Sequence, residues 1–94
     1  MPAVEAKLLT YDTRTQTKSF LLRVGAGVSM PSHGHHGYES CLVLEGEIDI
    51  GDLELVAGDF HGAGAGSAHP SVSTRHGALV YLHTALADYP DIHP

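Results

Sequence analysis

Three histidines and one glutamate occupy two glycine-framed segments at the spacing of metal ligands. His33, His35 and Glu39 lie in the first segment, and His69 lies in the second. Side chains two residues apart point to the same face of a β-strand, so His33 and His35 can bind one ion, and Glu39 keeps the same parity. Imidazoles combined with one carboxylate suit a divalent ion such as Fe, Mn, Ni or Zn, whereas an oxygen-only site suits calcium or magnesium. The sequence therefore predicts one divalent metal ion bound by these four side chains.

The two segments follow fixed patterns. The first reads G(x)5HxH(x)3E(x)6G from Gly27 to Gly46, and the second runs from Gly58 through Gly66 and His69 to Ser73. Both resemble the two motifs of the cupin superfamily, which are small antiparallel β-barrels that hold a metal between their sheets. The first motif is complete. In the second, Gly64 replaces the usual proline and Ser73 the usual asparagine, which alters turn details rather than metal binding.

Shorter runs indicate a branch of that superfamily. The segments 35–39, 43–46, 57–59 and 69–70 most resemble the cupin domain of ChrR-type anti-sigma factors, whose relatives include dioxygenases that act on diketones and hydroxyacetophenones. The resemblance covers roughly residues 20 to 84. It implies an all-β fold, a small antiparallel double-stranded β-helix of the cupin or jelly-roll type. Those anti-sigma factors also carry an N-terminal zinc-binding domain that contacts the sigma factor. Because few residues precede position 20 here, the sigma-binding function is not expected from this resemblance.

Two functions remain open. In the first, the chain is a mononuclear-metal enzyme of oxygenase type that acts on a small oxygenated organic molecule. Glu39 is then the catalytic residue, because a carboxylate ligand can leave the metal while three histidines keep it. In the second, the chain is a non-catalytic sensor or regulatory cupin with a closed zinc site. The identity of the metal separates the two.

Length and composition indicate a single small domain. The chain has 94 residues and a mass of 9.9 kDa. We expect one domain over 1–94, with the first motif at 27–46, the second at 58–73 and an irregular tail at 85–94. A domain of this size buries only about 60 to 65 per cent of its unfolded surface, so a bound metal or a partner subunit would add needed stability.

Net charge and cysteine content limit the classes of binding partner and the cell compartments that are expected. The formal net charge is −6, and the five Lys and Arg residues do not cluster, so neither nucleic acid nor an anionic membrane is expected. The lone Cys41 allows no intrachain disulfide and is either a small buried hydrophobe or a redox-active thiol beside the metal. The sequence shows no signal peptide and no apolar run of about 20 residues, which favours a cytoplasmic location.

Short apolar runs between glycine, proline, aspartate and serine predict strands and no long helix. Gly51-Asp52 is typical of a two-residue type II′ hairpin turn. We expect strands at 6–11, 19–24, 39–44, 47–50, 53–56, 71–73 and 78–84.

The parity of the strand that carries Glu39 predicts which side chains face inward. If Glu39 faces inward, Cys41 and Val43 do so too, while Leu42 and Leu44 face outward. The outward leucines and the edge strand 6–11 favour a homodimer.

The remaining positions complete the expected site. His36 is expected to face solvent, and His61 is expected in a turn. The glycine-rich run 62–66 is expected to form a tight turn that brings His69 to the metal. His83 is either a cavity proton donor or a core histidine. A small ligand is expected in an apolar cavity lined by Phe20, Leu22, Cys41, Val43, Val72 and Tyr81.

Overall fold

The computed structural model describes residues 3–31, 33–69 and 71–94, and the side chains of His33 and His69 lie outside what it describes. Within these ranges all regular secondary structure is β-strand, and there is no helix long and apolar enough to cross a membrane. The strands are β1 (Val4–Asp12), β2 (Thr17–Val24), β3 (Ser29–Met30), β4 (His33–Gly34), β5 (Glu39–Ile50), β6 (Leu53–Val56), β7 (Phe60–Ala63), β8 (Ala68–His69), β9 (Val72–Ser73) and β10 (Ala78–Ala85).

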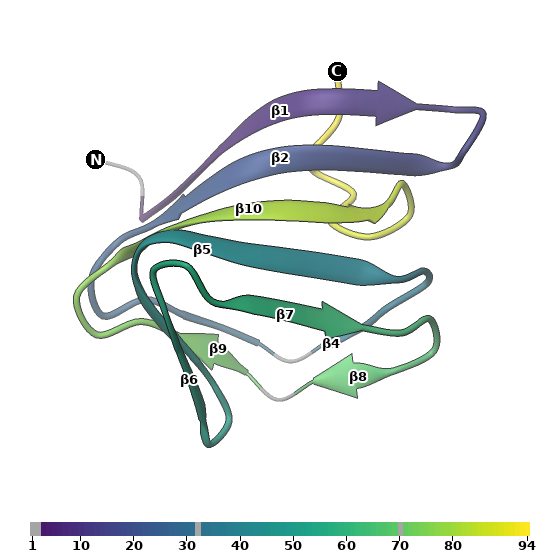
Figure 1. Ribbon diagram of the computed structural model, residues 1–94. Helices are drawn as coiled ribbons and strands as arrows, with labels where there is room; N and C mark the ends of the chain where they lie inside the picture. Colours follow the sequence, from purple (N-terminus) through teal and green to yellow (C-terminus); the bar gives the residue numbers. More distant parts are fainter. Residues whose placement is uncertain (1–2, 32, 70) are drawn as a thin grey trace.

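One curled antiparallel sheet builds both layers of the molecule (Figure 1). Its strand order is β1-β2-β10-β5-β9-β3, β6 and β7 also pair with β5, and β4 and β8 form a separate two-stranded ladder. The strand β5 belongs to both layers, because its first part pairs with β10 and β7 and its last part pairs with β6 and β9. The all-β, antiparallel fold class is therefore confirmed.

Gly46 allows β5 to pass from one layer to the other. Its φ angle is +77°, and a Cβ atom added there would lie 2.0 Å from the carbonyl oxygen of Gly77. The pairing of β5 with β10 also shifts register next to this point, between Leu79 and Val80. Only a glycine fits such a position, because a side chain would meet backbone that cannot move aside. The sequence predicted two strands here, and the structure forms a single bent strand.

Alternation along β2, β5 and β10 builds the core. Along β2, β10 and the first part of β5, up to Val43, alternate side chains are buried. The buried apolar residues are Phe20, Leu22, Val24, Cys41, Val43, Ile48, Leu55, Ala78, Val80 and Leu82. The parity predicted from Glu39 is confirmed, since Cys41 and Val43 are buried and Leu44 is exposed.

The hairpin between β5 and β6 is confirmed, and a strand after it was not predicted. Ile50 pairs with Leu53 across two turn residues, and Gly51 has a φ of +59°, as a type II′ turn requires at its first position. By contrast, Phe60–Ala63 forms β7, in which His61 pairs with Cys41. The expectation that His61 lies in a turn was wrong.

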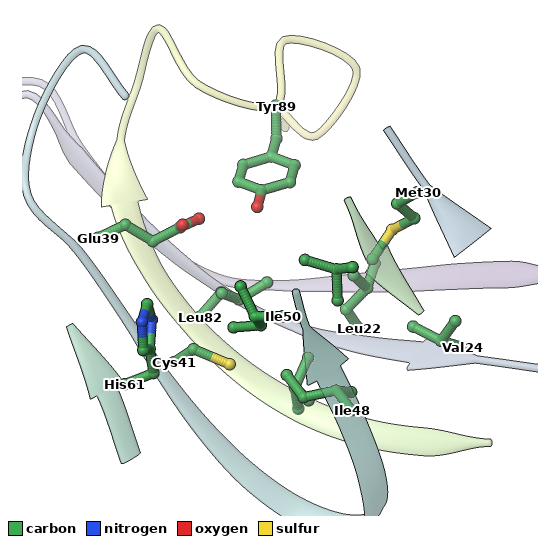
Figure 2. Close-up of a pocket in the computed structure, with 12 residues that line it drawn as sticks. Leu22, Val24, Met30, Glu39, Cys41, Ile48, Ile50, His61, Leu82 and Tyr89 are labelled. Atoms are coloured by element: carbon green, nitrogen blue, oxygen red, sulfur yellow. The ribbon is translucent and has the colours of Figure 1, made fainter. Parts of the chain in front are cut away.

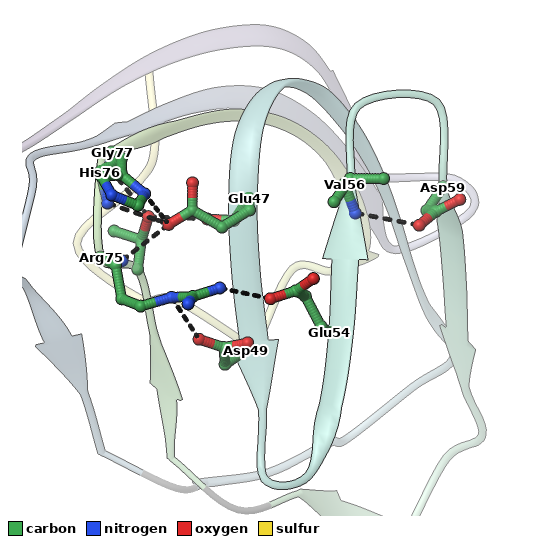
Figure 3. A network of polar contacts seen from close by, with 9 residues as sticks. Glu47, Asp49, Glu54, Val56, Asp59, Arg75, His76 and Gly77 are labelled. Atoms are coloured by element: carbon green, nitrogen blue, oxygen red, sulfur yellow. Dashed lines mark hydrogen bonds and ion pairs between the residues drawn. The ribbon is translucent and has the colours of Figure 1, made fainter.

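Glu47 holds the connection between β9 and β10 (Figure 3). Its Oε1 atom accepts hydrogen bonds from the backbone amides of Arg75, at 2.8 Å, and His76, at 2.9 Å. Chiefly through the His76 amide, these bonds lower the pKa of Glu47 below its ordinary value. The side chain of Arg75 in turn pairs with Glu54 on β6. These contacts connect the segment between β9 and β10 to both β5 and β6.

Candidate metal centre

The backbone brings the two predicted motifs together. His33 on β4 and His69 on β8 are directly opposite partners in the short antiparallel ladder. The ladder continues past β4, since the amide of His35 donates to Ser67 O at 2.8 Å and the amide of Gly66 donates to His35 O at 2.8 Å. The turn before β8 lies at Ala65 and Gly66 and places the backbone of His69 beside the first motif. The expectation of a tight turn over the whole run 62–66 was wrong, because Gly62 and Ala63 belong to β7.

His35 and Glu39 meet inside the protein. The Nε2 atom of His35 lies 2.6 Å from Oε2 of Glu39, and the two residues are only 4% and 6% exposed. Ser67 Oγ lies 3.2 Å from His35 Nδ1, which orients the ring so that Nε2 faces the carboxylate. Two atoms of the kind that ligate a divalent ion thus converge on one buried point.

These donors fit a divalent metal ion. The second oxygen of Glu39, Oε1, is buried and accepts no hydrogen bond of ordinary geometry from the residues that the structure describes, although the Tyr89 hydroxyl interacts with this carboxylate. A buried carboxylate in this state suits a cation, because an ionised group away from water needs a partner. Among the described side chains no group of three His, Cys, Asp or Glu residues could hold a metal ion. A complete site therefore needs the imidazoles of His33 and His69.

A small cavity adjoins this pair between the two layers (Figure 2). The volume of this cavity is ≈ 40 Å³. Its polar lining consists of Glu39, His61 and Tyr89. The rest of the lining is apolar or carries sulfur: Leu22, Val24, Met30, Cys41, Ile48, Ile50, Val72, Val80 and Leu82. Such a site admits a molecule of a few heavy atoms with a mostly apolar body.

The expected lining was partly right. Leu22, Cys41 and Val72 line the cavity, while Phe20 and Val43 are buried in the core without lining it. The prediction that Tyr81 lines the cavity was wrong, because Tyr81 pairs with the outward-facing Leu42 and lies on the outer face of the sheet.

His83 lies on the outer face as well. It pairs with Ser40, and it alternates with the buried Leu82 and Thr84 along β10. Neither a cavity role nor a core role fits that position.

Two polar residues of the cavity were missed from the sequence. His61 reaches the cavity because β7 pairs with β5, and the run Phe60–Ala63 has no periodic apolar pattern that would have indicated a strand. Tyr89 enters from residues 86–94, here called the strap, which lie outside the strands.

Cys41 is an apolar element of this cavity. Burial, with the nearby charge of Glu39 as a second cause, raises the pKa of the Cys41 thiol to about 12. The thiol therefore stays protonated at neutral pH, whereas redox reactivity requires the thiolate. Of the two expected roles, the small buried hydrophobe is the one supported.

The strap is bound to the strands by two buried charges. Lys18 on β2 is 1% exposed, and its Nζ donates to the carbonyl oxygens of Leu86, Tyr89 and Ile92 at 3.3, 2.8 and 2.8 Å. Burial lowers the pKa of Lys18, and the charge of Asp88 opposes that effect.

Asp88 is the second buried charge. It accepts from the amide of His36 and lies 2.6 Å from His36 Nδ1. Burial acts to raise the pKa of Asp88, but the hydrogen bonds from the His36 ring and amide outweigh it and the pKa is lowered. The tail expected at 85–94 is thus packed against the barrel.

Comparison with known proteins gives the class. The family model described as the ChrR cupin-like domain matches residues 1–87. The chain therefore belongs to this family of cupins, and the predicted cupin fold is confirmed. No curated protein matches the sequence.

Solved structures show the same fold. The chain is similar to an acetylacetone dioxygenase from Acinetobacter johnsonii, at 18% identity and a TM-score of 0.80, over 87% of this chain and 59% of that one. It is similar to a structure of Rhodobacter sphaeroides SigE in complex with the anti-sigma ChrR, at 24% identity and a TM-score of 0.77, over 89% of this chain and 46% of that one. KdgF from Halomonas sp. shares 18% identity at a TM-score of 0.73, over 90% of this chain and 81% of that one. The chain thus spans about three fifths of the length of the dioxygenase.

Proposed function

We propose that this cupin binds one divalent metal ion through His33, His35, Glu39 and His69 and acts on a small oxygenated organic molecule as an enzyme of oxygenase type. The observation that carries the proposal is the buried contact between His35 and Glu39 at the wall of a small apolar cavity. The register of His33 with His69 supports the same centre. The likeness to an acetylacetone dioxygenase is consistent with this chemistry.

The residues of the chain have separate roles in this proposal. A divalent ion at this centre supplies Lewis acidity toward a ligand oxygen. His35 is held by Ser67 so that its Nε2 atom faces the Glu39 carboxylate at the proposed centre. Glu39 faces both the centre and the cavity, so its carboxylate can give way to a ligand oxygen or accept a proton. The apolar walls exclude water from the reacting end.

A regulatory function is the second candidate, and one comparison favours it. The family model that matches the chain is that of the ChrR domain, and a ChrR–SigE complex shares the fold. In that case the centre would hold zinc in a closed site and the cavity would have no catalytic role. The cytoplasmic location stays a prediction in either case.

Metal analysis with variants tests the proposal. Protein purified without chelators or an affinity tag should carry about one divalent ion per chain, measured by plasma mass spectrometry, and should melt at a lower temperature after chelation. His35→Ala should lose the metal, while His93→Ala, in the exposed tail, should keep it. A metal-free protein whose melting is indifferent to divalent ions would contradict the centre.

Oxygen uptake then separates the two functions. The iron(II) form should consume oxygen when offered small diketones or hydroxyketones. Glu39→Gln should keep most of the metal but change that turnover. Tightly held zinc, with no oxygen uptake across the panel, would support the regulatory function instead.

We further propose that the chain forms a homodimer through the outer face of the sheet. Leu44 is 41% exposed there and Phe60 is 61% exposed. Phe60 lies directly opposite the half-buried Leu42 in the β5–β7 pair, which makes the exposed apolar area continuous. A second copy of the chain would remove this area from water.

A further inference from the structure

The imidazole of His61 is a polar group in the wall of a mostly apolar cavity. The other two polar residues of that wall are already engaged, because Glu39 contacts His35 and Tyr89 interacts with Glu39. By contrast, among the residues that the structure describes, the His61 ring makes no hydrogen bond and no ion pair. A polar group beside apolar walls normally has a hydrogen-bond partner, since leaving it unpaired costs free energy. The ring nitrogens of His61 are therefore available to a molecule that enters the cavity.

The pairing of β7 with β5 turns His61 inward. His61 lies directly opposite Cys41, and opposite residues in an antiparallel pair have their side chains on the same face. Cys41 is buried, and along β7 the half-buried His61 follows the exposed Phe60. Glu39 precedes Cys41 by two residues, so it is a diagonal neighbour of His61, and both side chains can reach one small molecule. Figure 2 shows the His61 ring near Cys41 on the cavity wall.

Contacts around His61 hold β7 in place. The ladder to β5 continues before β7 begins, since the amide of Val43 donates to Asp59 O at 3.0 Å. On the strand itself, Gly62 has no side chain, and the Tyr38 ring occupies the space that one would fill. A hydrogen-bonding group on a strand fixed in this way is preorganised, so little conformational entropy is lost when a ligand binds to it.

The chemistry of the ring limits the class of ligand. A neutral imidazole carries a proton on one nitrogen and a lone pair on the other, and none of the described residues fixes which nitrogen is protonated. The nitrogen that faces the cavity can therefore be an N–H donor to a ligand oxygen. The volume of ≈ 40 Å³ limits the ligand to a few heavy atoms, and the apolar walls accommodate its hydrocarbon part. A carboxylate ligand is disfavoured, because Glu39 is an acidic group in the same small space.

We propose that His61 is a ligand-orienting residue, whose ring N–H donates a hydrogen bond to the oxygen of a short, neutral carbonyl compound bound in the cavity. This inference rests on the proposed function, because it concerns the same cavity and names the class of its ligand. The apolar part of the ligand would pack against the walls, and His61 would determine which end carries the oxygen.

Two probes that differ in hydrogen bonding test this role. Acetone has one carbonyl oxygen, whereas xenon binds apolar cavities without a hydrogen bond. Each is titrated into the zinc-loaded full chain and followed by NMR, through the ring signals of His61 and the methyl signals of Val80 and Leu82. In the parent, the ring signals should shift with acetone and saturate together with the methyl signals.

Variants at position 61 separate the hydrogen bond from packing. His61→Leu removes the ring nitrogens and keeps a side chain of similar size. It should weaken acetone by about 2- to 10-fold, the effect of one hydrogen bond, without weakening xenon. His61→Gln restores an N–H donor and should bind acetone within about 2-fold of the parent. His83→Leu, on the outer face, should change neither probe.

Any of four results would overturn the inference: no saturable binding of acetone, no shift of the His61 ring signals with acetone, unchanged acetone binding in His61→Leu, or equal weakening of acetone and xenon in that variant. A His61→Gln chain that binds acetone as weakly as His61→Leu would overturn it as well, because the ring would then act only through packing. If His61→Leu does not fold, the ring signals of the parent and the affinity of His61→Gln decide.

Metal content and the same titration on chelated protein separate this inference from the proposed function. A chain that binds no metal but shows His61-dependent binding of acetone refutes the metal centre and supports the role of His61. A chain that binds metal but shows no such dependence supports the metal centre and refutes the role of His61.

Discussion

Replacing Lys18 by methionine should release the strap and destabilise the protein. Methionine has a similar length and is apolar, so Lys18→Met keeps most of the packing on β2 and removes the ammonium group. Three strap carbonyls lose their donor in that variant. They then either stay buried without a partner or move out to water with the strap.

The structure bounds the size of the effect. A buried carbonyl without a partner costs about 1 to 3 kcal/mol, so three would cost about 3 to 9 kcal/mol if the strap stayed in place. That sum approaches the whole stability of a domain, which is about 5 to 15 kcal/mol. Detachment is cheaper, because it mainly exposes the side chains of Tyr89 and Ile92, which pack against the core. Removing the charge also removes the energetic cost of burying it. We therefore expect the free energy of unfolding of Lys18→Met to fall by about 2 to 4 kcal/mol.

Urea denaturation and amide hydrogen exchange measure the two consequences. The free energy of unfolding should fall by the amount given above, and residues 86–92 should lose protection more than β2 does. Lys7→Met, at an exposed position on β1, is the matched control. It should change neither the free energy of unfolding nor the protection of residues 86–92 by much. If Lys18→Met left the unfolding free energy within about 0.5 kcal/mol of the parent and the strap equally protected, the assignment of Lys18 as its anchor would be wrong.

Three further changes have definite expected outcomes. Asp88 has a pKa that is lower in the folded than in the unfolded chain, so its stabilisation is complete above the unfolded value of about 3.9 and is lost as pH falls through the folded value. Acid unfolding of chelated Asp88→Asn, followed by circular dichroism, should therefore depend less on pH below about 5 than that of the parent or of the exposed control Asp52→Asn. Gly46→Ala should cost at least about 2 kcal/mol in urea denaturation and Gly64→Ala, which has open space around it, less than about 0.5; similar losses for both would contradict the close approach at Gly46. Leu44→Glu should convert a dimer into monomers in light scattering during gel filtration, and a parent that is already monomeric at micromolar concentration would refute the outer-face interface.

Local pattern was enough to predict the fold class and the inner face of β5. Glycine-framed spacing of His33, His35, Glu39 and His69 indicated a cupin, and the family match confirms it. Alternation with period two predicted that Cys41 and Val43 are buried and Leu44 exposed, and these burial states are confirmed. These features depend only on neighbours in the chain, so a single sequence carries them. The metal-ligand set itself stays a prediction.

Pairing between distant strands decided what the local pattern left open. Both faces of β10 carry apolar residues, so its parity could not be derived locally, and only the pairing of Leu82 with Cys41 turns Tyr81 outward. His61 reaches the cavity because the edge of β5 supplies hydrogen bonds to a run that has little strand propensity of its own.

The contact between Lys18 and Tyr89 is the clearest case in which tertiary structure was needed. The two residues are 71 positions apart, and nothing in the sequence around Lys18 distinguishes it from a solvated lysine on a strand. Its burial arises only when the strap folds back over β2 and presents three carbonyl oxygens at the distance of the ammonium group. The sequence gives the type of a side chain and the face of the strand on which it lies. The hydrogen-bond partners that allow a charged side chain to be buried come from residues distant in the sequence, so only the tertiary structure shows them.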